Sequence, residues 1–411
     1  DGSDASTTAS FTHDKTIDQG YDFQMNPTTA TVLDPLEIAR QLARQFAQTA
    51  AERDRQGGNP KAERDLIRRS GLLSLSIPTE YGGQGATWPT IFKTVQILAQ
   101  ADSSLAHVYA FHHLLIATVQ LFAQPAQYQH WLQQTVQQQL FWGNALNPLD
   151  RRTTVTPVSE TEYLFQGDKS FCSGSVDSDL LLCSGYDATG RLLIAVIPST
   201  RSGVYFLGDW HNMGQRQTDS GTTHFEQVCV HQHELLLNPG PLSTPYASLR
   251  PLIAQLIFVH LFLGVAEGAF ETAIQSVQGQ KAWSKSRVEK AVDDPFIQRH
   301  CAEFYLQLES VRLLADKAVQ SVQQAWCIGP ELTAEQRGEV AVAIATAKIA
   351  STNTSLYITE HMFQVMGARA TTAQLNLDRF WRNARVHTLH DASRWKYYFI
   401  ANYLLNGVLP P

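Results

Sequence analysis

A ten-residue stretch near the end of the chain, Arg382–Asp391, concentrates side chains that carry charge or exchange protons. It reads Arg-Asn-Ala-Arg-Val-His-Thr-Leu-His-Asp. His387 and His390 are three residues apart, so a helix here places them on one face. Because imidazole both gives and takes a proton near neutral pH, the pair suits proton transfer, half of a metal site, or a polar seam between packed helices.

A second group of histidines lies in an apolar stretch, residues 88 to about 122, that we expect to form one long helix. His107 and Phe111 share a face of that helix, and three histidines so close together indicate a site. We interpret His112 and His113 as structural. No carboxylate or cysteine lies three or four residues after any of these histidines, so we expect no metal.

Composition narrows the class of protein. The chain has 411 residues, 44% of them hydrophobic, and a net charge of −6 without a basic block, so we expect a globular protein without a nucleic-acid partner. Its five cysteines are scattered without a CxxC pair, which favours a reducing, cytoplasmic location. The apolar run Leu252–Ala266 is too short and too polar for a membrane span, and the acidic, Ser/Thr-rich N-terminus does not resemble a signal peptide.

Helical signals occur on both sides of a β-rich middle. Residues 1–31 are polar and aperiodic, and we expect a mobile tail. Order is expected to begin at Asp34, a helix N-cap followed by Pro35. Toward the C-terminus we predict helices at 251–278, 295–324, 333–366 and 389–405.

The middle of the chain contains short runs typical of strands. They are 163–165, 170–172, 180–184, 192–197, 203–207 and 222–230. We expect a small antiparallel sandwich or barrel, and no GxGxxG motif indicates a dinucleotide fold. The predicted fold class is α+β, with an N-terminal helical domain (32–145), a central antiparallel β domain (146–245) and a C-terminal four-helix bundle (246–411).

Four motifs, taken in their order along the chain, resemble the acyl-CoA dehydrogenase superfamily over about residues 34–405. They are Gly71…Pro78…Tyr81-Gly82-Gly83, Lys169–Gly174, Asn212–Thr218 and Gln364–Gly367. The resemblance implies that the hydroxyl of Ser173 lies beside the flavin N5 edge. It also implies that the loop at Gln364 reaches the flavin of a neighbouring subunit, and hence a homotetramer.

One departure from that family bears on the reaction. Its dehydrogenases carry a catalytic glutamate in an R-D-A-x(6)-E-G-T segment, whereas here Arg382-Asn383-Ala384 is followed, after six residues, by Asp391-Ala392-Ser393. Aspartate, preceded by His390, thus stands where the glutamate is expected. The family's other base position falls within 241–266, where no Asp or Glu occurs. An aspartate reaches less far, which disfavours abstraction of a proton from an acyl-CoA.

The ending His-Thr-Leu-His-Asp resembles instead the flavin-dependent monooxygenases of the same fold, the dibenzothiophene monooxygenases in particular. Phe141–Asn144, Gly208–Trp210 and Asp293–Pro295 share that resemblance. It implies reduced FMN from a separate NAD(P)H:flavin reductase, reaction with O2 through a C4a-hydroperoxyflavin, and oxygen transfer to a small, organosulfur substrate. Two alternatives stay open: an FAD-dependent acyl-CoA dehydrogenase with Asp391 as base, and a non-catalytic oligomeric scaffold.

The resemblance assigns candidate site residues to three roles. The catalytic candidates, which supply a proton or a hydrogen bond, are His390, His107, Ser173 and Asn144. The cofactor-binding candidates are Ser173, Trp210, Arg287, Gln364, Gly367, Arg369 and His387. The pocket has to exclude water, and its expected walls are Phe111, Trp142, Phe171 and Leu389. Asp391 is expected to orient a histidine or to bind Arg385.

Overall fold

The N-terminal part of the molecule is helical. The computed structural model describes residues 34–411, so the tail expected at 1–31 lies outside the described residues. The helices are α1 (Pro35–Gln56), α2 (Lys61–Arg69), α3 (Trp88–Ala101), α4 (Ser103–Phe122) and α5 (Pro125–Gln138). The predicted helix start is confirmed, because the Asp34 carboxylate accepts a hydrogen bond from the Leu36 amide at 3.1 Å and Pro35 lies in the first turn.

The single helix predicted over 88–122 is wrong, since the chain breaks at Asp102. This residue has an extended backbone, and its carboxylate accepts hydrogen bonds from the amides of Ser104 (3.0 Å) and Leu105 (3.1 Å). Such a side chain caps a new helix in place of the backbone partners that its first turn lacks. His107 therefore lies in the first turns of α4, a helix that is buried almost throughout.

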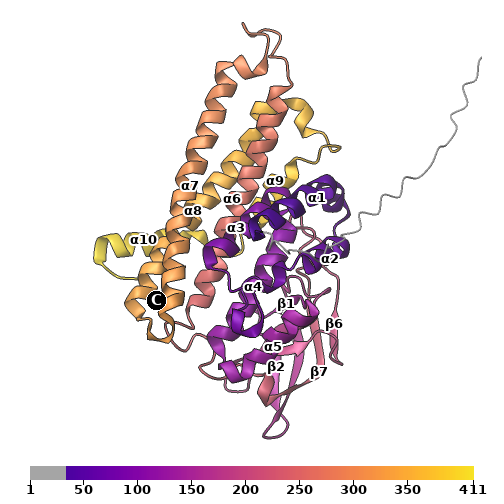
Figure 1. Cartoon of the computed structure of the whole chain (residues 1–411), viewed down its shortest axis with the longest axis vertical. Helices are drawn as coiled ribbons and strands as arrows, with labels where there is room; N and C mark the ends of the chain where they lie inside the picture. Colours follow the sequence, from indigo (N-terminus) through magenta and orange to yellow (C-terminus); the bar gives the residue numbers. More distant parts are fainter. Residues whose placement is uncertain (1–33) are drawn as a thin grey trace, which may run out of the picture. The chain divides into compact units, whose positions relative to one another are not determined.

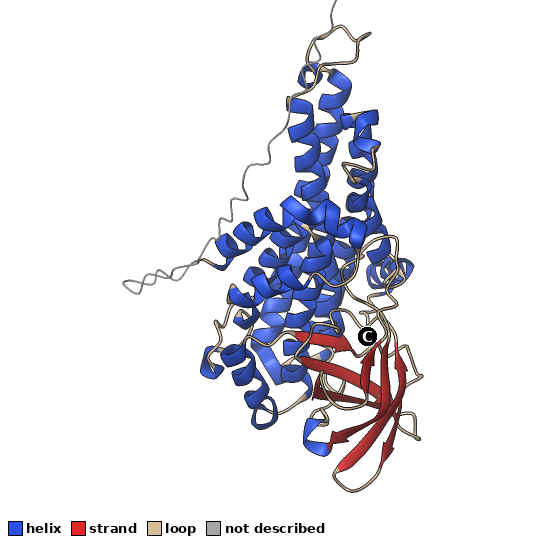
Figure 2. Ribbon diagram, turned by 90° about the vertical axis from the view of Figure 1, so that its right-hand side faces the viewer, coloured by secondary structure: helices blue, strands red, loops and turns tan. Residues whose placement is uncertain are grey.

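The central sheet has seven strands. They are β1 (Trp142–Ala145), β2 (Thr154–Pro157), β3 (Glu162–Lys169), β4 (Leu180–Tyr186), β5 (Leu192–Pro198), β6 (Val204–Phe206) and β7 (Thr223–His231). The strand order is β1-β4-β2-β3-β7-β6, with β5 also paired to β4. Figure 2 shows the strands as one twisted layer beside the helices, and β1 packs against α4.

The sheet is mixed, which corrects the expectation of a purely antiparallel domain. β1 and β2 both pair with β4 in parallel, and Trp142 lies opposite Leu180 in that register. Parallel partners need a long connection, and here β2 and β3 lie between β1 and β4 in the chain. The run at 170–172 is not a strand, and Phe171 within it has a left-handed backbone with φ of 58°.

The C-terminal part contains three long helices and two shorter ones. They are α6 (Leu249–Gln278), α7 (Pro295–Ile328), α8 (Ala334–Met366), α9 (Asp378–His387) and α10 (Ser393–Asn406). The three long helices run side by side, with α6 against both α7 and α8 (Figure 1). The fourth helix expected over 389–405 begins instead at Ser393, and α9 was not predicted.

His387 and His390 do not share a helical face. His387 is the last residue of α9, and His390 lies in the turn that follows, where its amide donates to the His387 carbonyl at 3.2 Å. Ala392 is extended and separates this turn from α10. The orientation of the two imidazoles therefore depends on tertiary packing around the turn and not on helical periodicity.

The largest hydrophobic core lies among the helices, where α6 packs against α3, α4 and α8. By length and composition α4 and α6 each qualify as a membrane span, whereas the sequence analysis considered only the run Leu252–Ala266 within α6 and judged it too short and too polar. In their most apolar windows 94% and 89% of residues are buried inside the described structure. Such burial is what core helices of a globular protein show.

Candidate active site

The ring of Phe258, in the middle of α6, is the common contact of the histidines that the sequence analysis singled out. The His390 ring lies 4.2 Å from it, His387 5.1 Å and His107 5.9 Å, measured between ring centroids. The three imidazoles come from α4, the end of α9 and the following turn. The fold thus gathers residues nearly 300 positions apart around one aromatic ring.

His107 is buried and stacks between Phe111 at 4.2 Å and His387 at 4.9 Å. Within the described part of the chain neither of its ring nitrogens has a hydrogen-bond partner. Burial lowers the pKa of His107 to about 3, so the ring is neutral at pH 7. An unsatisfied buried imidazole is costly, which indicates that a ligand supplies the missing partner.

His387 is held by an amide that the sequence analysis did not single out. Gln215 Nε2 donates to His387 Nδ1 at 3.3 Å and to the carbonyl of Asn383 at 3.2 Å, and it lies 2.9 Å from Ser103 Oγ. Because Nδ1 accepts, the proton of the neutral ring sits on Nε2. Burial, followed by the charge of His107, lowers the pKa of His387 well below its usual value.

His390 differs from the other two because one side of it is open to solvent. Burial of its other side lowers its pKa, and the positive charge of Lys348 adds to that effect. The neighbouring Leu389 is 69% exposed, so this turn forms the outer edge of the cluster.

Lys348, on α8, completes the surroundings of Phe258. Its ammonium lies 4.2 Å above the Phe258 ring and 4.9 Å above the Phe262 ring. The residue is 1% exposed, and Nζ has no hydrogen-bond partner among the described residues. The sequence signal that was missed is a single lysine in a run of small and apolar residues, Ala341–Ser355.

Asp391 binds a residue other than the one expected. Its carboxylate lies 3.2 Å from Lys396 Nζ, whereas Arg385 donates to Thr388 Oγ1 at 3.2 Å. The expectation that Asp391 holds Arg385 is therefore wrong. Its negative charge acts on both Lys348 and His390, whose pKa values it raises against the effect of burial.

Ser173 and Asn144 are brought together by a backbone contact. The Asn144 amide donates to the Ser173 carbonyl at 3.1 Å. Ser173 Oγ is 2.7 Å from Ser220 Oγ, which is 2.8 Å from Thr218 Oγ1, so three hydroxyls form a chain. Asn144 Oδ1 is buried and, in the described residues, has no partner.

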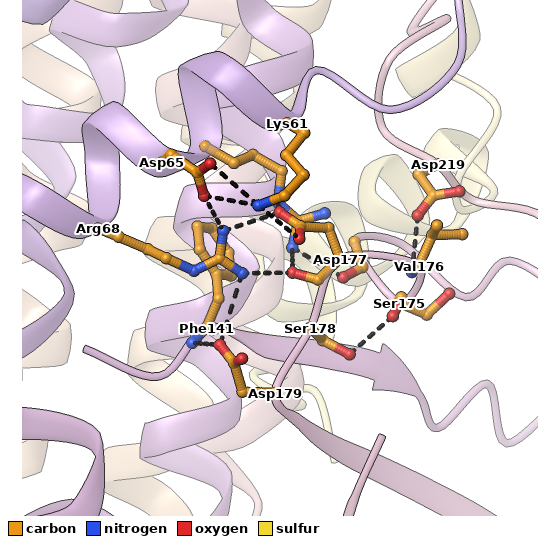
Figure 3. A network of polar contacts seen from close by, with 12 residues as sticks. Lys61, Asp65, Arg68, Phe141, Ser175, Val176, Asp177, Ser178, Asp179 and Asp219 are labelled. Atoms are coloured by element: carbon orange, nitrogen blue, oxygen red, sulfur yellow. Dashed lines mark hydrogen bonds and ion pairs between the residues drawn. The ribbon is translucent and has the colours of Figure 1, made fainter. Parts of the chain in front are cut away.

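A network of charged groups fixes the segment that follows Ser173 (Figure 3). Arg64 donates to the carbonyls of Gly174 at 3.0 Å and Asp177 at 2.7 Å, and Arg68 donates to the Asp177 carboxylate at 2.8 Å. The Phe141 amide, just before β1, donates to Asp179 at 2.7 Å. Helix α2 thereby ties together the segments that carry Asn144 and Ser173.

The aromatic candidates occupy two different environments. Phe171 is 61% exposed and contacts Trp210 edge to face at 6.1 Å, and the Trp210 indole donates to the Gln215 carbonyl at 2.7 Å. Trp142 is buried, and its indole donates to Thr135 on α5 at 2.8 Å. The structure thus brings Phe171 and Trp210 together at an exposed edge, whereas Trp142 packs toward the helical core.

The predicted phosphate contacts are exposed side chains or loop residues. Arg287 lies in the loop between α6 and α7. Gln364 is in the last turn of α8, Gly367 is its C-cap with φ of 77°, and Arg369 follows in a short 3-10 helix. Within residues 34–411, no hydrogen bond or ion pair joins these four residues to the histidine cluster. Their role stays a prediction that requires a second subunit.

Two hollows in the described structure lie away from the histidines. The larger, about 220 Å³, lies between Trp88, Trp326 and Gln120. The smaller is lined by Asp102, Ser104, Gln217 and Asn383, and so adjoins the Gln215 contacts. The closed packing around Phe258 agrees with a site that a ligand has to open, or with one that a partner group fills.

One group of possible metal ligands occurs away from these residues. Glu162 on β3 and His231 and Cys229 on β7 have ligand atoms within 4.8 Å of one another. The sequence argument missed this group because it considered spacing along the chain and not pairing across strands. Glu162 and His231 are 3.6 Å apart and about half exposed, as in an ordinary surface pair. The absence of a metal from the reaction stays a prediction.

Two family models match the chain, one in its N-terminal part and one in its C-terminal part. Residues 36–139 match the family described as "Acyl-CoA dehydrogenase, N-terminal domain". Residues 256–395 match "Acyl-CoA dehydrogenase, C-terminal domain". The fold class predicted from the sequence is confirmed at this level, with helical regions on either side of a central sheet.

Three of the similar proteins have names that describe monooxygenases. A probable FMNH2-dependent monooxygenase, SfnC of Pseudomonas putida, is 53% identical over 91% of this chain and 95% of its own. Methanesulfinate monooxygenase MsuC from Pseudomonas fluorescens is 54% identical, with a TM-score of 0.91 over 92% of this chain and 99% of its own. Dibenzothiophene monooxygenase TdsC from Paenibacillus sp. A11-2 is 41% identical, with a TM-score of 0.88 over 92% of this chain and 98% of its own for a structure with FMN bound.

Proposed function

This chain belongs to the flavin monooxygenase branch of the acyl-CoA dehydrogenase superfamily, and we propose that it oxygenates a small organosulfur compound with reduced FMN and O2. Reduced FMN, when bound, reacts with O2 and supplies the oxygen atom that is transferred. A separate NAD(P)H:flavin reductase provides the reduced cofactor. The observation that carries the proposal is the cluster of His107, His387 and His390 on Phe258, next to Asp391, the position at which the resemblance places the base of a dehydrogenase.

The residues present fit a flavin. A planar, polar ring system needs hydrogen-bond partners and apolar contact, and the chain offers unsatisfied buried groups in Asn144 Oδ1 and both nitrogens of His107. Ser173 Oγ is already oriented by Ser220 at 2.7 Å, so its second hydrogen-bonding direction is free for the ring edge. Phe171 and Trp210 offer an exposed aromatic edge beside the Gln215 carbonyl.

The three histidines differ in exposure to solvent, and we assign each of them a different role on that basis. His390 has a solvent-facing side and can exchange its proton with water, so we assign it the delivery of a proton to the oxygen atom left behind after transfer. His107 is sealed and neutral, so we assign it a hydrogen bond to the same region. His387, held through Nδ1 by Gln215, presents its Nε2–H and is assigned to cofactor binding.

The dehydrogenase alternative is disfavoured by the state of Asp391. Its carboxylate pairs with Lys396 at 3.2 Å, so a cation already occupies one of its two oxygens. The same position is preceded by an imidazole that packs on Phe258 at 4.2 Å. We therefore propose FMN and oxygen transfer over FAD and α-proton abstraction.

We further propose a cytoplasmic homotetramer. Helix α10 has no fully buried residue and exposes Trp395, Tyr398 and Leu405, the last at 81%. Large apolar side chains gathered on one helix usually lie in an interface. The five cysteines are all free in the structure, which suits a reducing compartment. Multi-angle light scattering, at about 46 kDa per chain, distinguishes a tetramer from a monomer.

The proposal is tested by coupling the chain to an NADH-dependent FMN reductase and supplying methanesulfinate, dimethyl sulfone or dibenzothiophene in turn. Catalase is present throughout, because free FMNH2 makes peroxide that oxidises sulfur compounds without an enzyme. We expect chain-dependent product with at least one organosulfur compound. Product that forms equally without the chain, or no product with any of them, contradicts the proposal.

A further inference from the structure

Lys348 is a buried cation to which the proposed chemistry gives no role. Its ammonium has three donors, and the described residues supply no acceptor for any of them. The contacts with Phe258 at 4.2 Å and Phe262 at 4.9 Å lower the cost of burial, since a desolvated cation over an aromatic face gains about 2 kcal/mol. They leave the three hydrogen bonds unmade, so the position lacks an acceptor group.

Positive charge exceeds negative charge around His390. Burial lowers the pKa of His390 most; among the nearby charges, those of Lys348, Arg250 and Lys396 lower it further and that of Asp391 raises it. The Asp391 carboxylate is already paired with Lys396 at 3.2 Å. Arg250 donates to a neutral hydroxyl, Thr118 Oγ1, at 3.3 Å. An anion that enters beside Phe258 therefore meets uncompensated positive charge.

We propose that Lys348 binds the anionic head group of the substrate and so sets a preference for organosulfur oxyanions, such as the methanesulfinate that names one relative, over neutral sulfides and sulfones. This inference rests on the proposed function, and it names the substrate class and the residue that selects it. The site combines a buried ammonium without an acceptor, an aromatic surface for an alkyl group, and a solvent-open edge at His390 for entry.

A sulfinate satisfies both halves of this site. Its two oxygens share one negative charge and accept hydrogen bonds from the Lys348 ammonium, while the lone pair on sulfur stays available. The balanced reaction is R–SO2⁻ + O2 + FMNH2 → R–SO3⁻ + FMN + H2O. The sulfur lone pair forms the new S–O bond and the O–O bond breaks. The second oxygen leaves as water with the two protons, and sulfur and FMNH2 each give up two electrons.

Anion binding also has a protonation signature. Burial lowers the pKa of Lys348 to about 7, while Asp391 raises it and Lys396 lowers it. The other titratable groups near it are His387 and His390, whose pKa values are lowered by the charge of Lys348. A bound anion favours the charged lysine, so binding near pH 8 takes up a proton.

The test is calorimetric titration of methanesulfinate into the protein in excess oxidised FMN, for wild type, Lys348→Met and the exposed-lysine control Lys317→Met on α7. A charge-assisted hydrogen bond contributes about 1.5–3 kcal/mol, so we expect the Lys348→Met change to weaken binding by about 10- to 150-fold. We expect no change for Lys317→Met. Repeating the titration at pH 8 in buffers of different ionisation enthalpy should reveal proton uptake in wild type and none in Lys348→Met.

The outcomes separate this inference from the proposed function. Equal binding by wild type and Lys348→Met, absent binding by wild type, or equally tight binding of dimethyl sulfone each overturn the role of Lys348. Lys348-dependent binding in a protein that oxygenates no organosulfur compound supports the anion site and contradicts the proposed function. Methionine fills the space of lysine without a charge, and near-UV circular dichroism checks that the variant is folded.

Discussion

Two histidines on α4, His112 and His107, differ in whether their ring nitrogens have hydrogen-bond partners. His112 accepts a hydrogen bond from the Trp142 amide at 3.2 Å through Nδ1 and lies 2.8 Å from the Leu73 carbonyl through Nε2, so both ring nitrogens are satisfied. His107, five residues earlier, stacks on His387 and has no partner for either nitrogen among the described residues. Burial alone therefore does not distinguish a structural histidine from a site histidine. For this pair, the distinction lies in whether the two ring nitrogens have hydrogen-bond partners.

A histidine with both ring nitrogens bonded and one with neither bonded contribute differently to stability. A satisfied imidazole such as that of His112 joins η1 (Leu72–Ser74), α4 and β1 and stabilises the fold. An unsatisfied one such as that of His107 destabilises the empty protein and gains its partner only when a ligand arrives. The two predictions that follow on His390 and on the His107–His112 pair test this division most directly.

The largest effect is expected at His390, which packs on Phe258 beside His107. His390→Ala removes the proposed proton donor, and general acid catalysis typically contributes about 10²- to 10⁴-fold, so we expect a loss of that size in kcat for oxygenation. FMN binding, followed by fluorescence quenching, should stay nearly intact. Asp391→Asn is the comparison variant and should lose less. If Asp391→Asn loses more than His390→Ala, a carboxylate base is at work.

The second prediction concerns stability in the two groups. His112→Leu leaves a buried carbonyl and a buried amide without partners, at about 1–3 kcal/mol for each group, and we expect a total loss of about 2–6 kcal/mol in the free energy of unfolding. His107→Leu removes only an unsatisfied imidazole and should be neutral or stabilising. Urea unfolding at pH 7.5 measures both. Equal losses in the two variants would mean that the hydrogen-bond inventory does not divide the histidines.

The third prediction uses pH. The folded protein keeps His107 neutral down to about pH 3, whereas the unfolded chain takes up a proton below about pH 6.5. Stability that is present above pH 6.5 is therefore lost as the pH falls, and His107 accounts for about 2 kcal/mol of that loss by pH 5. Between pH 7.5 and pH 5, the free energy of unfolding should therefore fall less for His107→Leu than for wild type. An unchanged acid dependence contradicts the burial assigned to His107.

How far the sequence predicts this site depends on the range of the interaction. Asp34 and Pro35 mark the start of α1 locally, and the periodicity of α6, α7 and α8 is strong, so these elements were foreseen. The break at Asp102 was missed because the apolar pattern continues across it, and the cap becomes visible only in its hydrogen bonds. Parallel pairing of β1 with β4 is likewise non-local.

The site was foreseen in its residue types and not in its geometry. His107, Phe111, His387 and His390 do meet, as expected of a site. Phe258 was overlooked because one phenylalanine in an apolar helix gives no signal of its own. The same holds for the amide of Gln215, which contacts His387 across 172 positions. Such contacts follow from tertiary packing, which periodicity does not encode.

The smallest effect is expected at Ser173. Its hydroxyl is one of three in a chain with Ser220 and Thr218, so Ser173→Ala removes one hydrogen bond and leaves the loop in place through Arg64. A typical net hydrogen bond contributes about 1 kcal/mol, so the Kd for FMN should rise about fivefold. Ser178→Ala, whose hydroxyl bonds only to the Ser175 carbonyl in the described structure, is the control. An unchanged Kd removes Ser173 from the flavin contacts.

The central claim is that this chain transfers oxygen and does not abstract a proton. The most direct measurement supplies ¹⁸O2, reductase-generated FMNH2 and methanesulfinate, with catalase present, and determines the isotope content of the product by mass spectrometry. We predict methanesulfonate that carries one ¹⁸O atom from O2, in an amount that falls with His390→Ala. Product without ¹⁸O, or no product together with bleaching of bound flavin by an acyl-CoA under anaerobic conditions, contradicts the claim.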